Sequence, residues 1–270
     1  MLTNLSTDDI KRSIQAGWDE MSIDYQVETH ISLNDVHYAP LCPGERELQI
    51  LGEIAEKTVL ELACGAAQNS IALTKMGARC VGLDISAKQL AKASQLVKQE
   101  RVGVSLIKAD GETLRMFGDA VFDVVISCFG WEFIPDLEAC FLECHRVLAE
   151  GGLLVVGTTH PLTAFEWDED GQFLAVSDYF RPPVEIWEEL EGTIAQQGLT
   201  FFRTVEETFS TLVSVGFQVE GIWEPYPYPI NEMTEEEKRS IPYGGPFWEG
   251  QYERLSKVPF SIVYKARKCV

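Results

Sequence analysis

The segment VLELACGAAQNS, from Val59 to Ser70, places an acid and a glycine-containing turn at the end of an apolar run. Glu61 lies near the end of the run, and Gly65 lies in the turn between small residues that leave room for a ligand. Glycine accepts backbone conformations and close approaches that other residues resist. This pattern is typical of a strand whose carboxyl end lies against a bound molecule.

Three further apolar runs also end in residues that can bind a ligand. The second run ends at Asp84, where a carboxylate can accept two hydrogen bonds from the diol of a ribose. The third ends in ADGE, where Asp110 can accept a hydrogen bond from an exocyclic amine. The fourth ends in Ser127, Cys128 and Phe129. A turn, a ribose acid and a base acid in this order indicate a nucleoside ligand.

A dinucleotide such as NAD is the first alternative ligand. Its binding turn carries three glycines in the pattern G-x-G-x-x-G, and a pyrophosphate lies on the following helix. The turn ACGAAQN has one glycine, and Glu61 just before it would repel a pyrophosphate. An acid at that point favours a ligand with an ammonium or sulfonium group, so an NAD-dependent oxidoreductase is the weaker hypothesis.

The elements that must position these residues follow from the alternation of the sequence. We expect strands over 58–63, 79–85, 104–110, 122–128 and 153–159. Helices are expected between them, over 69–77, 86–100 and 136–152. This alternation is typical of a parallel sheet with right-handed crossovers. Because the carboxyl ends of parallel strands lie at one edge of the sheet, the candidate residues are expected to converge there.

The charge balance restricts the class of partner. The chain has 270 residues, with 22 Lys+Arg against 42 Asp+Glu and a formal net charge of −20. Nucleic acids and anionic membrane surfaces attract basic proteins, so we expect neither as a partner. A small neutral or cationic molecule fits this charge better.

The cysteines predict a reduced, cytoplasmic protein. There are seven cysteines, an odd number, and none is arranged as CxxC. Cys140, Cys144 and His145 lie on one expected helix, but structural zinc needs four ligands, so we interpret them as core residues and expect no metal. The first fifteen residues lack the apolar region of a signal peptide, and no apolar run is long enough to span a membrane.

Five segments in order resemble the class I S-adenosylmethionine-dependent methyltransferases. They are VLELACGAAQNS, GLDIS, KADGETL, FDVVISC and HRVLAEGGLLVV, between Val59 and about Pro161. The resemblance implies an α/β, Rossmann-like, doubly wound sheet of seven strands, mostly parallel with an antiparallel last strand. It also implies S-adenosyl-L-methionine as the cofactor and methyl transfer as the reaction.

The resemblance further implies which residues bind the cofactor. It assigns the methionine end to Glu61 and Gly65, the ribose to Asp84, the adenine to Ile85, Asp110, Gly111 and Glu112, and the surroundings of the sulfonium to Ser127, Cys128 and Phe129. Trp18 and Tyr25 resemble an N-terminal aromatic element that small-molecule members place over the cofactor. The turn departs from the family at Ala67, where a second glycine is common, but alanine is close to glycine in size.

The whole chain is expected to form a single methyltransferase domain over 1–270. Its parts are an N-terminal cap over 1–45, a cofactor-binding core over 46–160, an insertion or substrate lid over 161–203, and a C-terminal helix and strands over 204–270. The cap contains a helix over 8–26. The insertion is expected to contain a hairpin around Asp170 and Gly171.

The methyl acceptor is expected to be a small molecule, with N or O of an apolar or aromatic metabolite as the reacting atom. His160 follows the fifth strand in GTTHP, which makes it the candidate general base, although it can equally order the loop before Pro161. The acceptor pocket is predicted to include His160, Phe165, Tyr179, Trp223 and Tyr226. His30 and His37 lie near the cap, and the sequence does not place them.

Two alternatives stay open beside N- or O-methylation. One is C-methylation of a quinone-like ring, and the other is a nucleoside-binding regulatory relative without methyl transfer. Intact Asp84 and Asp110 fit all of these functions, so only turnover separates them. The sequence does not indicate the oligomeric state.

Overall fold

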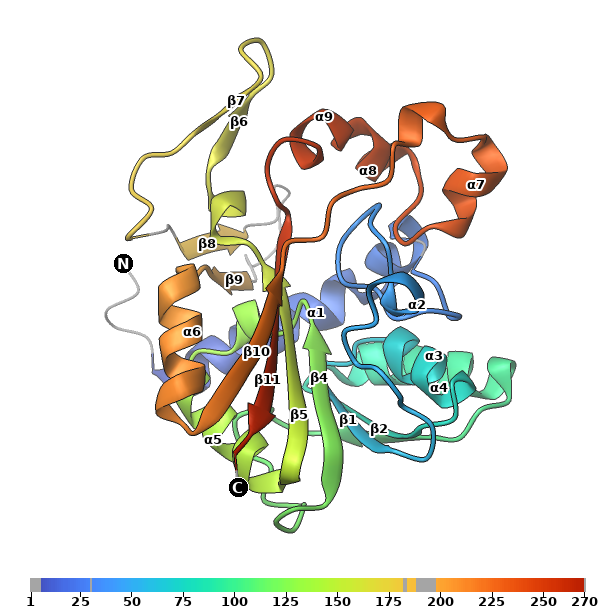
Figure 1. The fold of residues 1–270 in the computed structure, drawn as a ribbon, viewed down its shortest axis with the longest axis vertical. Helices are drawn as coiled ribbons and strands as arrows, with labels where there is room; N and C mark the ends of the chain where they lie inside the picture. Colours follow the sequence, from blue (N-terminus) through green and yellow to red (C-terminus); the bar gives the residue numbers. More distant parts are fainter. Residues whose placement is uncertain (1–5, 30, 182–183, 188–197, 270) are drawn as a thin grey trace.

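The computed structural model describes residues 6–29, 31–181, 184–187 and 198–269. Its centre is a seven-stranded sheet in the order β10-β11-β5-β4-β1-β2-β3 (Figure 1). The strands are β1 (Thr58–Leu62), β2 (Arg79–Asp84), β3 (Val104–Lys108), β4 (Phe122–Cys128), β5 (Leu148–Thr159), β10 (Phe217–Trp223) and β11 (Ser261–Lys268). Neighbours among β1 to β5 pair in parallel, and β11 is antiparallel to both β5 and β10. The expected fold class is confirmed.

Helices cover both faces of the sheet. The covering helices are α3 (Gln68–Lys75) and α4 (Ala87–Glu100) on one face, and α5 (Leu137–Val147) and α6 (Val205–Ser214) on the other (Figure 1). Alternate residues of a strand face opposite sides, so each strand contributes to two cores. Leu60 packs in the cluster beneath α5 and α6, whereas its neighbour Val59 packs in the cluster on the α3 face. The central strands are therefore apolar throughout.

Helix starts are set by side chains that accept backbone N–H groups. The Ser86 hydroxyl accepts from the backbone N–H of Gln89 at 3.1 Å, which begins α4 as the sequence predicts. Asp136 caps α5 in the same way, through the N–H of Ala139 at 3.0 Å. These caps determine the residue at which α4 begins after β2 and the residue at which α5 begins after β4.

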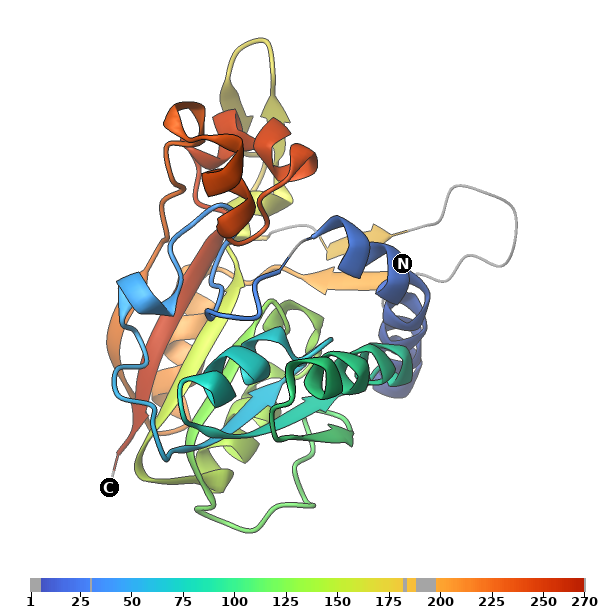
Figure 2. The same ribbon diagram turned by 90° about the vertical axis from the view of Figure 1, so that its right-hand side faces the viewer.

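The N-terminal cap is a long helix, α1 (Thr7–Glu28), followed by a buried loop and the short helix α2 (Glu45–Leu48). Figure 2 shows α1 crossing beside α4. The Asp19 carboxylate of α1 accepts from the Ser86 hydroxyl at 2.6 Å and from the backbone N–H of Lys88 at 3.1 Å. These bonds hold α1 against the carboxyl edge of the sheet.

The insertion contains the expected hairpin, formed by β6 (Glu166–Asp168) and β7 (Phe173–Ala175), after the 3-10 turn η3 (Pro161–Ala164). The strands β8 (Val184–Trp187) and β9 (Gly198–Phe201) pair farther along. Residues 182–183 and 188–197 of the predicted lid lie outside the described part. Another short turn, η2 (Trp131–Phe133), follows β4.

Between β10 and β11 the chain forms a helical segment that the sequence analysis does not describe. It contains η4 (Ile230–Glu232), α7 (Glu235–Ser240), α8 (Pro246–Gly250) and α9 (Tyr252–Leu255). A small core of Leu41, Ile230, Ile241 and Leu255 joins this segment to the N-terminal cap. Among the described residues, no helix has both the length and the apolar character needed to cross a membrane.

Candidate active site

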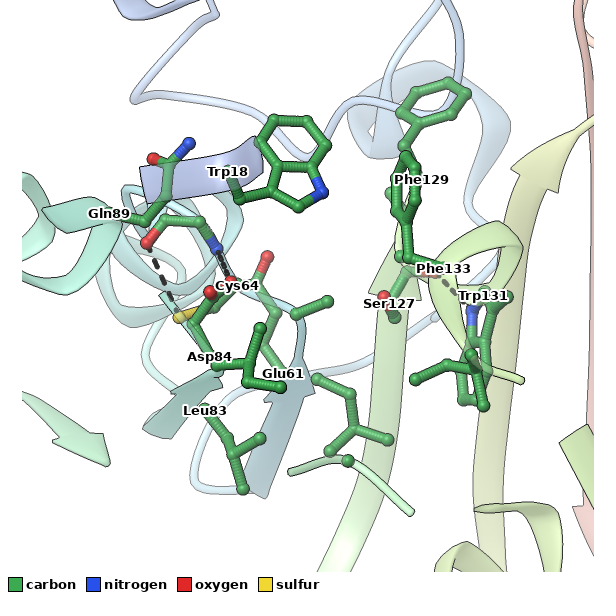
Figure 3. Close-up of a pocket in the computed structure, with 18 of the residues that line it drawn as sticks. Trp18, Glu61, Cys64, Leu83, Asp84, Gln89, Ser127, Phe129, Trp131 and Phe133 are labelled. Atoms are coloured by element: carbon green, nitrogen blue, oxygen red, sulfur yellow. Dashed lines mark hydrogen bonds between the residues drawn. The ribbon is translucent and has the colours of Figure 1, made fainter. Parts of the chain in front are cut away.

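A cavity that is partly open to solvent lies at the carboxyl ends of β1, β2 and β4. Figure 3 shows Glu61 and Asp84 at these strand ends and Trp18 above them on α1. Most of the predicted cofactor residues line it, namely Trp18, Tyr25, Glu61, Gly65, Asp84, Ile85, Asp110, Gly111, Ser127, Cys128 and Phe129. Glu112 is not in the lining. The expected convergence at one edge of the sheet is therefore present, whereas the binding roles remain predictions.

Asp84 is the best-fixed carboxylate of the cavity. One of its oxygens accepts from the backbone N–H of Gly65 at 2.8 Å, and the other accepts from the N–H of Ser86 at 2.8 Å. Its side chain lines the cavity, and 8% of the residue is exposed. Burial raises the pKa of Asp84 to about 6. Each oxygen keeps a lone pair, so the carboxylate can accept two further hydrogen bonds from a diol.

Glu61 lies deeper, with 4% of its surface exposed. It accepts from the backbone N–H of Ser70 at 2.8 Å and from the Ser70 hydroxyl at 2.5 Å. Burial raises the pKa of Glu61 to about 7, against the effect of these hydrogen bonds. A desolvated carboxylate with a raised pKa is stabilised by a cationic group placed beside it.

The turn after β1 is built from residues in the left-handed conformation. Ala63, Gly65 and Ala67 have φ angles of 49°, 53° and 62°. Ala67, where the family often has glycine, itself adopts the left-handed conformation and is the N-cap residue that precedes α3. Gly130 packs against the turn, and a Cβ there would lie 2.5 Å from the Ala63 Cβ. The absence of a side chain at Gly130 lets the segment between β4 and η2 approach the turn.

A lysine of α1 contacts the predicted adenine end. The Lys11 ammonium lies 2.6 Å from Asp110 Oδ2 and also pairs with Glu112. Asp110 Oδ1 accepts from the backbone N–H of Glu112 at 3.0 Å. The sequence analysis did not identify Lys11, because its pairing partners lie 99 residues and more away in the chain. Glu112 thus contributes to the cavity through Lys11.

Aromatic rings enclose the other end of the cavity. Trp18 contacts Tyr25 edge to face, with ring centroids 5.4 Å apart, and contacts Phe133 at 5.2 Å. Tyr25 also hydrogen-bonds Tyr243, and burial raises the pKa of both phenols. His37 and Tyr243 line the cavity beside Phe129. Tyr243 and Phe133 were missed by the sequence analysis, and His37 was not placed.

The predicted acceptor residues lie elsewhere in the described structure. The cavity lining includes none of His160, Phe165, Tyr179, Trp223 and Tyr226. Phe165 is buried, whereas Tyr226 is 67% exposed. The Tyr179 hydroxyl accepts from the backbone N–H of Val205 at 3.3 Å, at the start of α6. The insertion therefore contributes aromatic packing, and the rings around the cavity come from other segments.

Both ring nitrogens of His160 already have partners. Nδ1 accepts from the backbone N–H of Leu162 at 3.1 Å, and Nε2 lies 3.1 Å from a Glu224 carboxylate oxygen. Burial lowers the pKa of this imidazole, against the effect of Glu224. The residue therefore caps η3, which is the loop-ordering alternative named above.

We predict that His160→Gln lowers stability by about 1 kcal/mol through loss of the cap, with little change in kcat at saturating acceptor. Thermal unfolding and steady-state kinetics of the purified variant measure the two effects. A large fall in kcat with unchanged Tm would instead support His160 as the general base.

Comparison with known proteins agrees with this site. Residues 60–156 match the family described as a methyltransferase domain. The crystal structure of an S-adenosylmethionine dependent methyltransferase from Mesorhizobium loti has a TM-score of 0.63, with 22% identity over 82% of this chain and 95% of that chain. Residues 60–156 therefore match a methyltransferase domain, and the chain shares the fold of this S-adenosylmethionine dependent methyltransferase.

Two curated relatives have different extents of similarity. An uncharacterized protein of Haemophilus influenzae is 25% identical over 247 residues, which are 88% of this chain and 89% of that protein. The demethylmenaquinone methyltransferase of Mycobacterium tuberculosis is 37% identical over 99 residues, which are 36% of this chain and 39% of that protein. The sequence identity to the second relative is higher, but the aligned stretch is little longer than the matched domain.

Proposed function

We propose that the protein transfers the methyl group of S-adenosylmethionine to N or O of a small, uncharged apolar or aromatic acceptor. The observation that carries this proposal is the composition of the cavity. Carboxylates line the end next to the turn, and aromatic rings line the end next to Phe129. Lys11 is the one lysine or arginine among the described lining residues, and it is paired with Asp110 and Glu112.

The residues present fit the cofactor that the family uses. Asp84 would accept the ribose hydroxyls, and Glu61 would lie beside the methionine ammonium. Asp110 would accept from the adenine amine, next to Ile85. The Ser127 hydroxyl is buried without a hydrogen-bond partner in the described part of the chain, so a polar ligand group at that point would satisfy it.

The chemistry demanded of the protein is mainly positioning. When bound, the cofactor supplies a methyl group already activated by a sulfonium. The acceptor atom must lie in line with the bond that breaks, and correct placement alone can lower the barrier by about 7–11 kcal/mol. The cap helix α1, with Trp18 and Tyr25, would exclude water from this space. A hydroxyl acceptor also needs a group that takes its proton.

C-methylation of a quinone-like ring is the second candidate. The observation in its favour is the 37% identity to the mycobacterial demethylmenaquinone methyltransferase over 99 residues. A planar ring also fits between aromatic walls. The regulatory alternative, which binds a nucleoside without methyl transfer, is separated from both by turnover. The domain boundaries given above, with 161–203 as a substrate lid, remain part of the proposal.

Titration calorimetry with S-adenosylmethionine, S-adenosylhomocysteine and NAD tests the cofactor. We expect saturable binding of the two adenosyl ligands and none of NAD. A screen of phenols, aromatic amines and naphthoquinols with methyl-labelled cofactor then identifies the reacting atom. Binding of NAD alone would contradict the proposal, and adenosyl binding without any transfer would favour the regulatory alternative.

The raised carboxylate pKa values predict that cofactor affinity depends on pH. Asp84 is protonated below about pH 6 in the free protein, and a protonated carboxyl can no longer accept both ribose hydroxyls. The cofactor is therefore expected to bind about tenfold or more weakly at pH 5 than at pH 8. Calorimetry across this range measures the effect, and a constant Kd would contradict it.

A further inference from the structure

The loop between α1 and α2 places a histidine against the aromatic end of the cavity. The backbone N–H of His37 donates to the Asn69 side-chain oxygen at 3.1 Å, which fixes this loop to the start of α3. The next residue is held as well, because the Tyr38 hydroxyl donates to Glu45 at 2.6 Å and its carbonyl accepts from the Ser261 hydroxyl at 2.8 Å. His37 is therefore held through its own N–H and through the residue that follows it.

The imidazole of His37 is enclosed by aromatic rings. It stacks on Phe129 with ring centroids 6.2 Å apart and planes inclined by 19°, and it meets the edge of Tyr243 at 5.4 Å. The residue is 6% exposed, and its Nδ1 is buried without a hydrogen-bond partner in the described part of the chain. A buried polar atom without a partner costs about 1–3 kcal/mol, so its presence here needs an explanation.

The protonation state of this ring decides what it can bind. Burial lowers the pKa of His37 to about 4, against a side-chain hydrogen bond with Asn69 that raises it, so the imidazole is neutral at physiological pH. A neutral imidazole has one nitrogen that donates and one that accepts. It can therefore hydrogen-bond an uncharged O–H or N–H group, and it offers no charge to a carboxylate or phosphate.

We propose that His37 is the residue that recognises the methyl acceptor, by hydrogen bonding the O–H or N–H group of a planar, uncharged aromatic molecule. This inference rests on the proposed function and specifies its acceptor. Phe129 and Tyr243 hold the ring in place, and Phe129 lies at the end of β4, where the family resemblance places the sulfonium. An acceptor lacking the polar hydrogen leaves Nδ1 of His37 without a partner and binds more weakly.

Two naphthalenes that differ in one group test this recognition. 1-Naphthol carries a hydroxyl where 1-methylnaphthalene carries a methyl group of similar size. We expect protein saturated with S-adenosylhomocysteine to bind 1-naphthol tenfold or more tightly than 1-methylnaphthalene. His37→Phe keeps a flat ring but removes both nitrogens, and it is expected to abolish the preference. His37→Asn returns one hydrogen-bonding group and is expected to restore part of it.

S-adenosylhomocysteine affinity is measured first for each variant and is expected to stay within about twofold of the parent protein. If the parent protein does not bind S-adenosylhomocysteine, the proposed function is contradicted. If His37→Phe keeps the preference for naphthol, only the proposed role of His37 is overturned. Failure of the saturated protein to bind either naphthalene would also overturn the inference.

A measurement on the unaltered protein does not depend on the variants folding. With ¹⁵N-labelled histidine, the NMR chemical shifts of the His37 ring nitrogens are expected to change when 1-naphthol is added. They are expected to stay unchanged when 1-methylnaphthalene is added. Equal responses to both compounds would show packing without hydrogen bonding and would refute the proposal.

Discussion

Replacing Asp84 with asparagine is expected to weaken S-adenosylmethionine binding about 100-fold. Both oxygens of Asp84 already accept backbone N–H groups, from Gly65 and Ser86. An asparagine NH₂ group would face one of these donors, and it could no longer accept from a ribose hydroxyl. Loss of two charge-assisted hydrogen bonds is consistent with about 3 kcal/mol, which corresponds to the expected change in Kd.

The matched control is Asp123→Asn. Asp123 lies at the opposite end of β4, and its carboxylate also accepts a backbone N–H, that of Thr58 at 2.8 Å. Because it is far from the carboxyl edge of the sheet, its replacement is expected to leave the Kd unchanged. Calorimetry on both variants makes the comparison, and equal losses of affinity would show a general effect of altered strand ends.

Replacing Glu45 with alanine is expected to have the largest effect on stability, a loss of about 3 kcal/mol. Glu45 is 6% exposed and accepts from the Tyr38 hydroxyl at 2.6 Å. It also accepts backbone N–H groups of Ile50, Leu51 and Gly52 at 2.9–3.2 Å. Removing the carboxylate leaves several buried donors without an acceptor.

Urea unfolding measures this loss, with Glu53→Ala as the control. Glu53 is exposed, and its carboxylate accepts from the backbone N–H of Ala55 at 3.1 Å. Glu45→Gln keeps one acceptor oxygen and is expected to lose about half as much stability as Glu45→Ala. If the alanine variants at 45 and 53 unfold at the same urea concentration, the buried network contributes nothing.

The sheet and its edge could be predicted from the sequence because local patterns determine them. Continuous apolar runs mark β1, β4 and β5, and cap residues such as Ser86 mark helix starts. Once the strands are parallel, the residues at their carboxyl ends must meet, so Glu61 and Asp84 lie in one cavity. The family resemblance depends on the same local segments.

The aromatic end of the cavity could not be predicted in the same way. Tyr243 lies between α7 and α8, in a segment whose apolar residues follow no clear helical period. It contacts Tyr25, which comes from the opposite end of the chain. The insertion contains many aromatic residues, but neither Phe165 nor Tyr179 lines the cavity. Phe165 is buried elsewhere, and the Tyr179 hydroxyl bonds the backbone at the start of α6. The number of aromatic residues in a segment does not indicate which of them face a cavity.

Three of the residues around the aromatic end come from segments near the two termini of the chain, whereas Phe129 and Phe133 come from its middle. Tyr25, His37 and Tyr243 all lie outside residues 60–156, the part that matches the methyltransferase family. If His37 recognises the acceptor as proposed, acceptor choice depends on residues outside the matched segment. Exchanging the two terminal segments between relatives that share this segment is then expected to alter acceptor choice while leaving cofactor binding in place.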